Sequence, residues 1–360
     1  MMTPKERILA VLHRQPVDRL PIDLWHTPEI GAMLRQHCNV ADDLSLYRAL
    51  RLDKIVWDFI EYKTADNETA GAQSGAGAER GGSRTMWGVP LRGIQAGAAH
   101  YAEFGEAPLK DFDSPRQLDD YPWWPHPDRF DYDQAIAVAQ QAAPEFVVIG
   151  PWVSCFEIYC QLRGLEQAMM DLALDPDLVD AILDRVESIQ SEMMRRLFQR
   201  AGNLLTLAFI SDDVGGQNGL LMSPACWRRH LEPRMKRWCQ LIHAHGLKVF
   251  YHSDGGMEPL IGPLIECGID VLNPVQHACP GMELAALKKN FGDRVIFHGG
   301  VDNQTVLPRG TAAAVRAETR RCLETLGAGK SGYICCSCHN TQPGTPLENI
   351  LAMIETVQQC

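Results

Sequence analysis

The chain has 360 residues, of which 46% are hydrophobic and 22% charged, and its formal net charge is −11. A chain of this size and composition buries a full core without disulfides or a structural metal. Because it is acidic and has no basic run, nucleic acid is excluded as a partner. The stretch 1–16 carries charges where a signal peptide needs apolar residues, and no apolar run nears the roughly 20 residues that span a bilayer. We therefore expect a cytoplasmic protein with no membrane contact.

The predicted elements begin with a helix signal in which Thr3 caps, Pro4 lies in the first turn and Glu6 completes a capping box. Apolar runs of strand length then alternate with longer helical stretches. The predicted strands cover residues 19–25, 53–59, 146–150, 204–210, 247–252, 269–273, 294–300 and 331–336. The predicted helices cover residues 28–37, 43–51, 133–143, 155–173, 176–201, 224–245, 258–266, 281–290, 311–327 and 346–358.

Two stretches interrupt this alternation between the second and third strands. Residues 64–83 are rich in Gly, Ala and polar side chains, which predicts a flexible loop or a lid that orders on a ligand. Residues 85–94 read as a strand or turn, and the proline- and acid-rich passage 111–132 reads as irregular surface chain.

Strand–helix alternation is typical of an α/β fold with a parallel sheet. Eight such units within one chain of this length predict a single (β/α)8 TIM barrel that occupies residues 1–360 as one domain. An open doubly wound sheet is the alternative. Neither GxGxxG nor GxxxxGK[ST] follows any strand, so the phosphate loops of its nucleotide-binding versions are missing.

Polar side chains follow nearly every predicted strand, whereas the opposite strand ends read as turns with solvated charges. In a barrel, the active site lies at the carboxyl ends of the strands, so this asymmetry indicates an enzyme. In strand order, the side chains are Trp25 and His26; Asp58; Trp152 and Glu157; Asp212, Asp213 and Gln217; His252 and Asp254; Asn273; Asp302; and Cys336, Cys338 and His339.

Several of these side chains also have a structural interpretation. Asp212 and Asp213 precede glycines and suit a turn or cap, and Glu157 suits the first turn of a helix. His252 suits a satisfied core histidine. Asp58 lies within the apolar run VWDFI, where an unpaired carboxylate is costly to bury, which favours a functional or paired role.

The cysteines at the end of the eighth strand also include both structural residues and candidate ligands. Most cysteines of a cytoplasmic protein are small buried hydrophobes or inert thiols. Neighbours on a strand alternate faces, so Cys335 and Cys336 cannot both reach one site. We expect Cys335 to pack in the core, and Cys338 is the stronger candidate ligand of the remaining two.

The sequence resembles the uroporphyrinogen decarboxylase superfamily over nearly its whole length and in the same order. The residues that carry the resemblance are TPKERILAVLHRQPVDRLPID (3–23), GPW with LRG (150–164), HSDG (252–255), HGGVD (298–302) and HNTQPGTPLENI (339–350). The resemblance implies a single (β/α)8 barrel with a deep cleft at the carboxyl ends of its strands.

One branch of this superfamily consists of cofactor-free decarboxylases, which bind a tetrapyrrole's carboxylates through arginines in an RQAGR-like segment. This chain has DLWHTPEIGAMLRQHC at that place, with Arg35 as a lone cation. Asp58 and His339 match the decarboxylase aspartate and late histidine, but Glu157 stands near the expected tyrosine. A substrate with many carboxylates needs several cations, so these departures disfavour porphyrin decarboxylation.

The other branch resembles methylcobalamin:coenzyme M methyltransferases and related corrinoid-dependent methyltransferases. In that branch, a His-x-Cys pair and a later Cys hold zinc. Here His252 aligns with the histidine, Asp254 and His339 stand where the cysteines belong, and Cys338 is one residue away. The resemblance implies that these four residues are candidate zinc ligands in a harder, more oxygen-rich site. The same residues allow a metal-free site in which they act as acid and base.

Our leading hypothesis is a corrinoid-dependent methyltransferase component that moves a methyl group between a small methylated substrate or acceptor and a separate corrinoid protein. No DxHxxG corrinoid motif occurs in the chain, so the corrinoid would arrive on this partner; a homodimer is left open. The catalytic candidates are His252, Asp254, His339 and Asp58. The substrate-binding candidates are Glu157, Asp212, Asp213, Gln217, Trp25, His26, Trp152 and Asn340. The alternatives are a cofactor-free decarboxylase-like lyase centred on Asp58 and His339, and a barrel that only binds a ligand.

Overall fold

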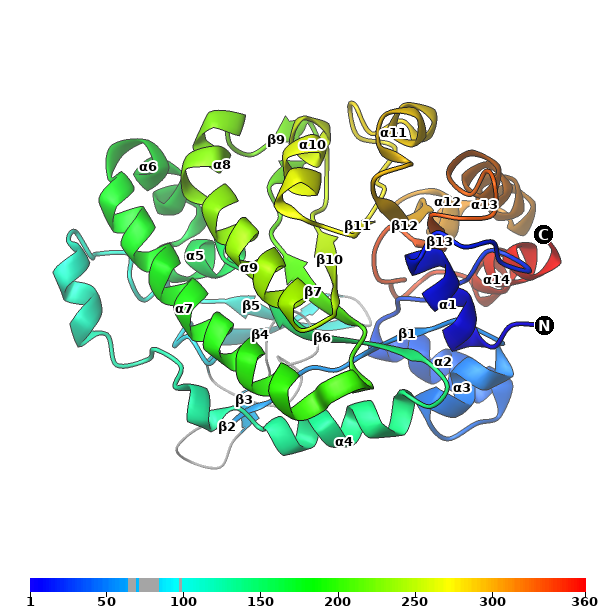
Figure 1. The fold of residues 1–360 in the computed structure, drawn as a ribbon, viewed down its shortest axis with the longest axis horizontal. Coiled ribbons are helices and arrows are strands. Elements are labelled where there is room, and N and C mark those ends of the chain that lie inside the picture. Colours follow the sequence, from blue (N-terminus) through cyan, green and yellow to red (C-terminus); the bar gives the residue numbers. More distant parts are fainter. Residues whose placement is uncertain (64–68, 71–83, 97–98) are drawn as a thin grey trace.

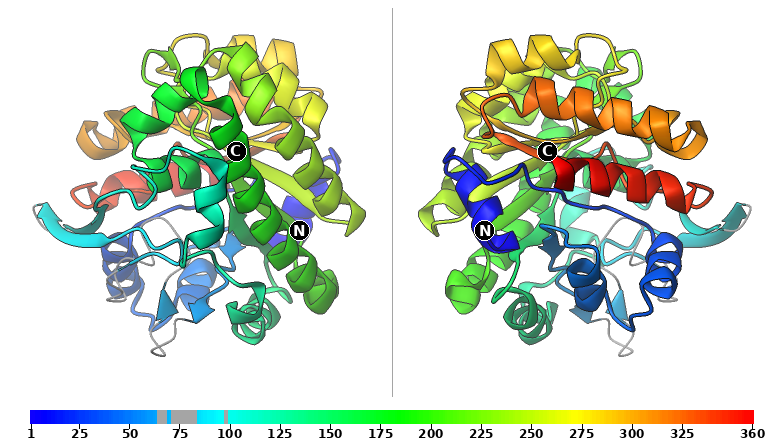
Figure 2. Two further views of the ribbon diagram at one scale, coloured as in Figure 1. Left: turned by 90° about the vertical axis from the view of Figure 1, so that its left-hand side faces the viewer. Right: turned by 90° about the vertical axis from the view of Figure 1, so that its right-hand side faces the viewer.

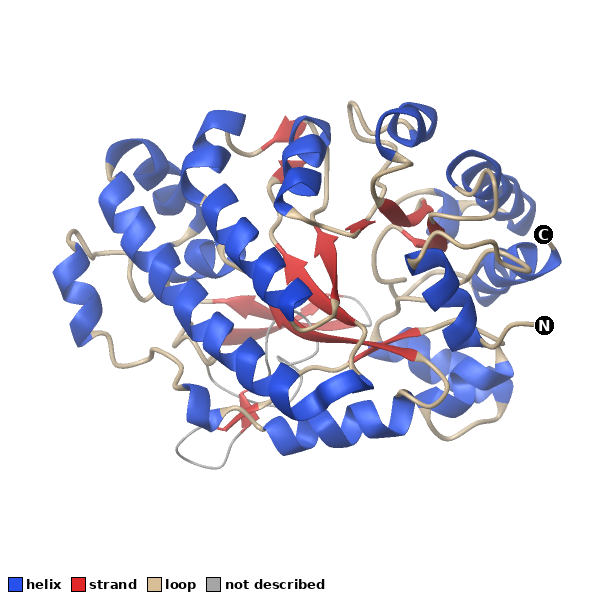
Figure 3. Ribbon diagram, viewed as in Figure 1, coloured by secondary structure: helices blue, strands red, loops and turns tan. Residues whose placement is uncertain are grey.

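The computed structural model describes residues 1–63, 69–70, 84–96 and 99–360, and these form an α/β barrel with a parallel sheet at its centre (Figure 3). The sheet has seven strands in the order β1-β6-β7-β10-β11-β12-β13, and every neighbouring pair is parallel. Their bounds are β1 Ile55–Trp57, β6 Val147–Val153, β7 Leu207–Ser211, β10 Lys248–His252, β11 Val271–Asn273, β12 Ile296–Val301 and β13 Tyr333–Ser337.

The extended segment before α2 closes the barrel between the two edge strands. Ile22 forms a parallel bridge with Cys335 of β13, and its carbonyl oxygen accepts a hydrogen bond from the Asp53 amide just before β1. The predicted strand 19–25 therefore takes the eighth position of the barrel, although only isolated bridges form there. Pro21 has no amide hydrogen to donate, which shortens the ladder. The predicted TIM barrel is confirmed.

The helices surround this sheet on its outside (Figures 1 and 2). Their bounds are α1 Pro4–Leu12, α2 Pro28–Cys38, α3 Asp43–Ala49, α4 Tyr132–Ala142, α5 Phe156–Arg163, α6 Leu165–Leu174, α7 Pro176–Ala201, α8 Pro224–His230, α9 Glu232–Ala244, α10 Glu258–Cys267, α11 Leu284–Phe291, α12 Val306–Arg309, α13 Ala312–Leu326 and α14 Leu347–Gln359. Parallel strands covered in this way are buried on both faces, and β6, β7, β12 and β13 are buried along their whole length.

Two long predicted helices are each interrupted. The predicted helix 155–173 breaks at Gly164, whose φ of 79° lies in the region that favours glycine. The predicted helix 224–245 breaks at Leu231, two residues before Pro233, because proline cannot donate the hydrogen bond that a continuous helix needs.

Three antiparallel strand pairs of the described residues lie outside the barrel sheet. They are β2 Tyr62–Lys63 with β3 Thr69–Ala70, β4 Leu91–Ala96 with β5 Ala99–Phe104, and β8 Gly215–Gly216 with β9 Gly219–Leu220. The stretch 85–94, predicted as a strand or turn, contains a turn at 86–87 and then the start of β4 at Leu91. Apart from Thr69 and Ala70, the predicted loop or lid 64–83 lies outside the described residues.

An aromatic cluster fills the middle of the barrel. Trp25 stacks on Phe250 at a ring-centroid distance of 6.0 Å, and Trp57 meets Phe209 edge-on at 4.4 Å. The ring of His298 lies 5.0 Å from that of Phe250, so a histidine is part of this core. Among the described residues, no helix is both long enough and apolar enough to cross a membrane.

Candidate active site at the barrel mouth

Three of the predicted ligands meet at the carboxyl ends of the strands, a place we call the barrel mouth. His252 ends β10, Asp254 follows two residues later, and His339 follows β13. One potential ligand atom from each of the three lies within 4.8 Å of the other two. The fold thus brings together side chains from the fifth and eighth strand ends, as the strand-end pattern predicts.

The distances between polar atoms of the trio, and from His252 to the neighbouring Asp213, are longer than hydrogen bonds. His252 Nε2 lies 3.8 Å from Asp213 Oδ1 and 3.9 Å from Asp254 Oδ1, and His339 Nε2 lies 4.0 Å from Asp254 Oδ2. The two imidazole rings meet edge-on at 5.5 Å. Hydrogen bonds need about 3 Å between heavy atoms, so these polar atoms surround a point without satisfying one another.

Close backbone packing holds the two aspartates beside each other. Asp213 Oδ1 accepts a hydrogen bond of 2.8 Å from the Asp254 amide. A Cβ on Gly215 would lie 2.4 Å from the Asp254 carbonyl oxygen. Likewise, a Cβ on Gly255, whose φ is 84°, would lie 2.6 Å from the Gly216 backbone nitrogen. Only glycine allows this approach, which explains the glycines that follow both aspartates in the sequence.

The mouth is rich in carboxyl groups. Glu157, in the first turn of α5, accepts a hydrogen bond of 2.8 Å from Ser211 Oγ. Burial and the neighbouring Asp213 raise the pKa of Glu157 well above its ordinary value, with Asp212 and Asp254 adding to the effect. Like charges so close together disfavour ionisation, so Glu157 retains its proton at a pH where an exposed glutamate has lost it.

Asp212 has a structural task at the same place. Its Oδ1 accepts hydrogen bonds from Ser154 Oγ and the Phe156 amide, both at 2.6 Å, and thus caps the start of α5 from a different strand. Burial raises the pKa of Asp212 to about 7, although these donors oppose the shift. Of the predicted pair, Asp213 faces the trio while Asp212 fixes the helix that carries Glu157.

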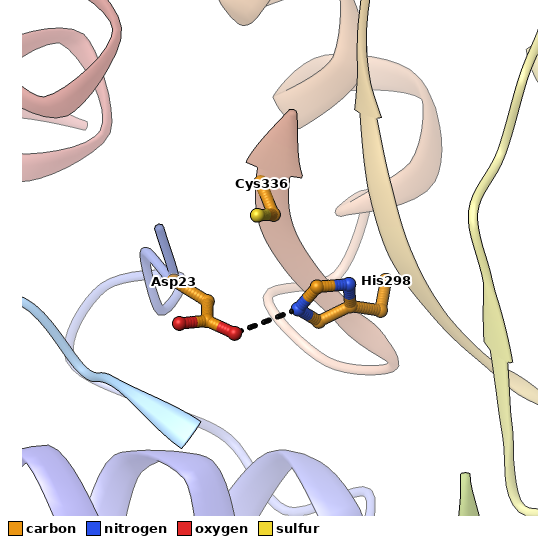
Figure 4. A group of neighbouring side chains, drawn as sticks. All are labelled: Asp23, His298 and Cys336. Carbon is orange, nitrogen blue, oxygen red and sulfur yellow. Dashed lines mark hydrogen bonds and ion pairs between the residues drawn. The ribbon is translucent and has the colours of Figure 1, made fainter. Parts of the chain in front are cut away.

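A second polar group lies deeper, among the aromatic rings of the barrel interior. Asp23, on the extended segment 21–27, accepts hydrogen bonds from Lys54 Nζ at 2.8 Å and from Trp25 Nε1 at 3.0 Å. Figure 4 shows its other contact, with His298 Nε2, at a distance of 3.0 Å. Burial alone would raise the pKa of Asp23, but Lys54 and His298 hold it below its usual value. Burial lowers the pKa of His298.

Asn273 connects this interior group to the barrel mouth. Its Nδ2 lies 2.7 Å from His298 Nδ1, and its Oδ1 lies 2.5 Å from His252 Nδ1. A continuous hydrogen-bonded series, which we call the relay, therefore runs from the buried Lys54 through Asp23, His298 and Asn273 to His252.

Asp23, His298 and Cys336 also lie close enough to hold a metal ion (Figure 4). However, both ring nitrogens of His298 already have hydrogen-bond partners, and Lys54 neutralises Asp23. Burial raises the pKa of Cys336 above its ordinary value, which keeps the thiol protonated. A metal would have to displace these buried partners, so the trio at the mouth is the better ligand set.

Asp58 is a buried carboxyl group that follows β1. It is 1% exposed, and neither of its carboxylate oxygens has a hydrogen-bond partner among the described residues. Burial raises the pKa of Asp58 to about 7. The costly burial that the apolar run predicts is therefore present, and no described side chain pairs with the carboxyl group.

The structure does not bring the predicted ligand Cys338 into the trio. Its thiol donates to the Val275 carbonyl oxygen at 3.3 Å, and burial raises its pKa well above the ordinary value. Cys335 lies beside Cys322 of α13, as expected of a packing residue. Cys335 and Cys338 have the spacing of a CxxC pair, but burial raises the pKa of both thiols well above the ordinary value, which keeps them protonated.

The other predicted substrate-binding residues lie around the trio at various depths. Trp25 is buried and its ring stacks on His252 at 6.0 Å, and Trp152 is buried within β6. His26 is half-buried and hydrogen-bonds through Nδ1 to the Thr27 carbonyl oxygen. Gln217 is exposed in the turn between β8 and β9 and accepts from Gln276 at 3.4 Å. Asn340 donates its amide hydrogen to His339 Nδ1 at 2.7 Å.

The residues behind His252 had no predicted role. Asp23, His298 and Lys54 are essentially inaccessible, and Asn273 was noted only as a strand end. A signal was present, because Asp23 and His298 interrupt apolar strand-like runs in the same way as Asp58. Their mutual pairing depends on barrel closure, which joins residues 275 positions apart.

A closed parallel barrel with titratable side chains gathered at the carboxyl ends of its strands defines the architecture of a (β/α)8 enzyme class. Within that class, the family model described as uroporphyrinogen decarboxylase (URO-D) matches residues 109–360. The chain belongs to this family.

Proteins of both branches are among the relatives. A uroporphyrinogen decarboxylase from Thermus thermophilus is 34% identical over 139 residues, which cover 38% of each chain. The methylcobamide:CoM methyltransferase MtaA of Methanosarcina barkeri is 22% identical over 217 residues, covering 60% of this chain and 59% of the relative. The matched regions thus span less than two thirds of these relatives.

A solved structure extends the similarity over the whole fold. A methyltransferase from Methanosarcina mazei superposes with a TM-score of 0.67 at 18% identity, covering 100% of this chain and 99% of that one. At this identity the likeness concerns the fold, and it agrees with a single barrel.

Proposed function

We propose that this protein is a methyltransferase of the uroporphyrinogen decarboxylase family that moves a methyl group between a small substrate and the corrinoid of a separate protein. The observation that carries the proposal is the trio His252, Asp254 and His339, whose polar atoms converge on one point at the barrel mouth without bonding to each other. The similarity to a methylcobamide-dependent enzyme supports the same function.

The trio fits a divalent metal by its chemistry. Two imidazoles and a carboxylate are ligands that zinc accepts, and they are harder than a pair of thiolates. Bound there, zinc would act as a Lewis acid on an oxygen or nitrogen of the substrate. His252 would offer Nε2 and Asp254 a carboxylate oxygen. His339 would have to turn its ring, because its Nδ1 accepts a hydrogen bond from Asn340 and its neutral form then carries the proton on Nε2.

The surrounding acids favour a neutral or cationic substrate. Asp213 and Glu157 lie beside the trio, which itself contains Asp254, and Arg35, the lone cation after the first strand, is paired with Asp43. A ligand with many carboxylates would meet repulsion here and gain no counter-charge. The same electrostatics oppose binding of a porphyrinogen.

The test is a methyl-exchange assay with methylated corrinoid proteins and a panel of small thiols, ethers and amines. Transfer is followed by the change in corrinoid absorbance when cobalt loses or gains its methyl group. We expect exchange with at least one pair and a loss of about 100-fold or more in His252→Ala. Absence of exchange across the panel, with a protein that is folded by circular dichroism, would refute the proposal.

A decarboxylase-like lyase is the second candidate, because Asp58 matches the decarboxylase aspartate and is a buried carboxyl group with no hydrogen-bond partner in the part of the chain that the structure describes. Such a group, with a pKa of about 7, is suited to proton exchange near neutral pH. This candidate requires turnover of uroporphyrinogen and its loss in Asp58→Asn. Turnover by the wild type without methyl exchange would replace the first proposal with this one.

A further inference from the structure

The buried residues behind His252 form a one-directional series of hydrogen bonds, and the direction follows from the chemistry at its inner end. Asp23 is 0% exposed and has two basic partners, Lys54 and His298. One carboxylate neutralises one cation, and lysine is the stronger base of the two. The positive charge therefore resides on Lys54, and a second buried charge on His298 would have no counter-ion.

A neutral His298 can have its proton on only one ring nitrogen. Its Nε2 faces the Asp23 carboxylate at 3.0 Å, and an ionised carboxylate only accepts hydrogen bonds. The proton of His298 is consequently on Nε2, and its Nδ1 is an acceptor.

This assignment fixes the orientation of the Asn273 amide. His298 Nδ1 lies 2.7 Å from the Asn273 amide nitrogen, which must donate to it. The Asn273 carboxamide oxygen then faces His252 Nδ1 at 2.5 Å and accepts from it.

We propose that Asn273, held by His298 and Asp23, is a positioning residue that keeps the proton of His252 on Nδ1 and its Nε2 lone pair directed at the barrel mouth. The proposal rests on the proposed function in one respect, which is that the Nε2 lone pair of His252 is used as a metal ligand or as a base. Outer partners of this kind fix the tautomer of metal-binding histidines.

The relay determines the tautomer of His252 because the carboxylates at the barrel mouth favour the opposite one, with the proton on Nε2. His252 Nε2 lies 3.8 Å from Asp213 and 3.9 Å from Asp254, and both carboxylates attract a proton on that nitrogen. Without an acceptor at Nδ1, the proton would move to Nε2 and occupy the position that a ligand or substrate needs. His339 shows the contrast, since its Nδ1 accepts from Asn340 and its Nε2 carries the proton toward Asp254.

The test reads the tautomers directly, by two-bond hydrogen–nitrogen NMR of the metal-free protein labelled with ¹⁵N-histidine. Signals are assigned by their loss in His252→Ala, His298→Ala and His339→Ala. In the wild type, we expect His252 protonated at Nδ1, and His298 and His339 protonated at Nε2. A wild-type His252 protonated at Nε2 would overturn the proposal.

Two substitutions at Asn273 separate positioning from packing. Asn273→Leu keeps the volume and removes the acceptor, so His252 shifts to the Nε2–H tautomer. Asn273→Asp keeps an acceptor for His252, so its Nδ1–H tautomer remains. Asn349→Leu is the matched control, because Asn349 of α14 is 1% exposed, donates to the Leu307 and Gly310 carbonyl oxygens, and has no hydrogen bond to a histidine among the described residues. It leaves every histidine signal of the trio unchanged.

Zinc affinity, measured by competition with a coloured chelator, gives the second readout. We expect Asn273→Leu to weaken zinc binding about 10- to 100-fold and Asn349→Leu to leave it unchanged. An unchanged His252 tautomer in Asn273→Leu, or a shifted one in Asn273→Asp, would refute the relay. If the tautomers behave as expected but the wild type binds no zinc, the relay stands and the metal-dependent form of the proposed function fails.

Discussion

The interior of the barrel and its mouth both contain histidine and aspartate, but their polar atoms are arranged in opposite ways. In the interior, Asp23, His298 and Asn273 lie within 2.5 to 3.0 Å of their partners and each atom has a complementary one. At the mouth, the corresponding separations are 3.8 to 4.0 Å. The interior group is thus satisfied by the protein alone, whereas the polar atoms of the trio are not hydrogen-bonded to one another, an arrangement that the proposed function would use to hold a ligand.

Breaking the interior group is expected to have the largest effect on stability. Asp23→Leu leaves Lys54 as a buried charge without a counter-ion and removes the acceptor of His298 Nε2. The free energy of unfolding should fall by about 3–5 kcal/mol, as measured by urea denaturation. The double variant Asp23→Leu/Lys54→Met should recover part of this loss. A fall of less than about 1 kcal/mol in the single variant would show that the pair contributes little.

Asp58 is expected to have an effect of intermediate size, because it is buried like Asp23 but no described residue forms a hydrogen bond with its carboxylate oxygens. Its pKa is about 7 in the folded protein and about 3.8 without the fold. Between these values only the folded state keeps the proton, so the contribution of Asp58 to stability declines as pH rises from about 4 to 7.

The expected decline is at most about 1.4 kcal/mol per pH unit for this one group. Denaturation of the wild type and Asp58→Asn from pH 5 to 8 isolates it, since the asparagine does not titrate. The wild type should lose stability relative to the variant on going to higher pH. Parallel curves would mean that Asp58 is ionised across the range.

The smallest change in stability is expected at the mouth, together with a large loss of function. Asp254 is 37% exposed at its side chain and has Asp213 as a close acidic neighbour. Asp254→Asn should alter the free energy of unfolding by no more than about 0.5 kcal/mol. Methyl transfer should fall by about 100-fold, because a ligand or base is lost. Equal loss of stability at Asp23 and Asp254 would remove the distinction between the two regions.

The sequence predicts the mouth better than the interior, for a physical reason. His252, Asp254 and His339 follow strands in the chain, and parallel strands bring their carboxyl ends together, so spacing along the sequence predicts proximity. Asp23, Lys54 and His298 are buried within apolar runs, and their pairing follows from barrel closure and side-chain direction. The local sequence pattern contains no information on barrel closure or on the direction of these side chains.

The helix breaks follow the same division between local and tertiary causes. Gly164 and Pro233 were visible in the sequence as helix-breaking residues, and reading them as breaks would have corrected both long helices. The role of Asp212 was not visible in this way. As a turn residue it resembles Asp213, and only the packing of β7 against the start of α5 makes it the cap of that helix.

Metal content tests the central claim most directly, namely that the open spacing at the mouth is a ligand site. The protein, purified without chelator or a metal-binding tag, is analysed by elemental mass spectrometry before and after exposure to zinc and desalting. The account predicts about one zinc per chain, lost in His252→Ala and in Asp254→Ala and retained in Asn349→Leu. A wild type that retains no zinc after exposure, or variants that retain it as well as the wild type, would contradict it.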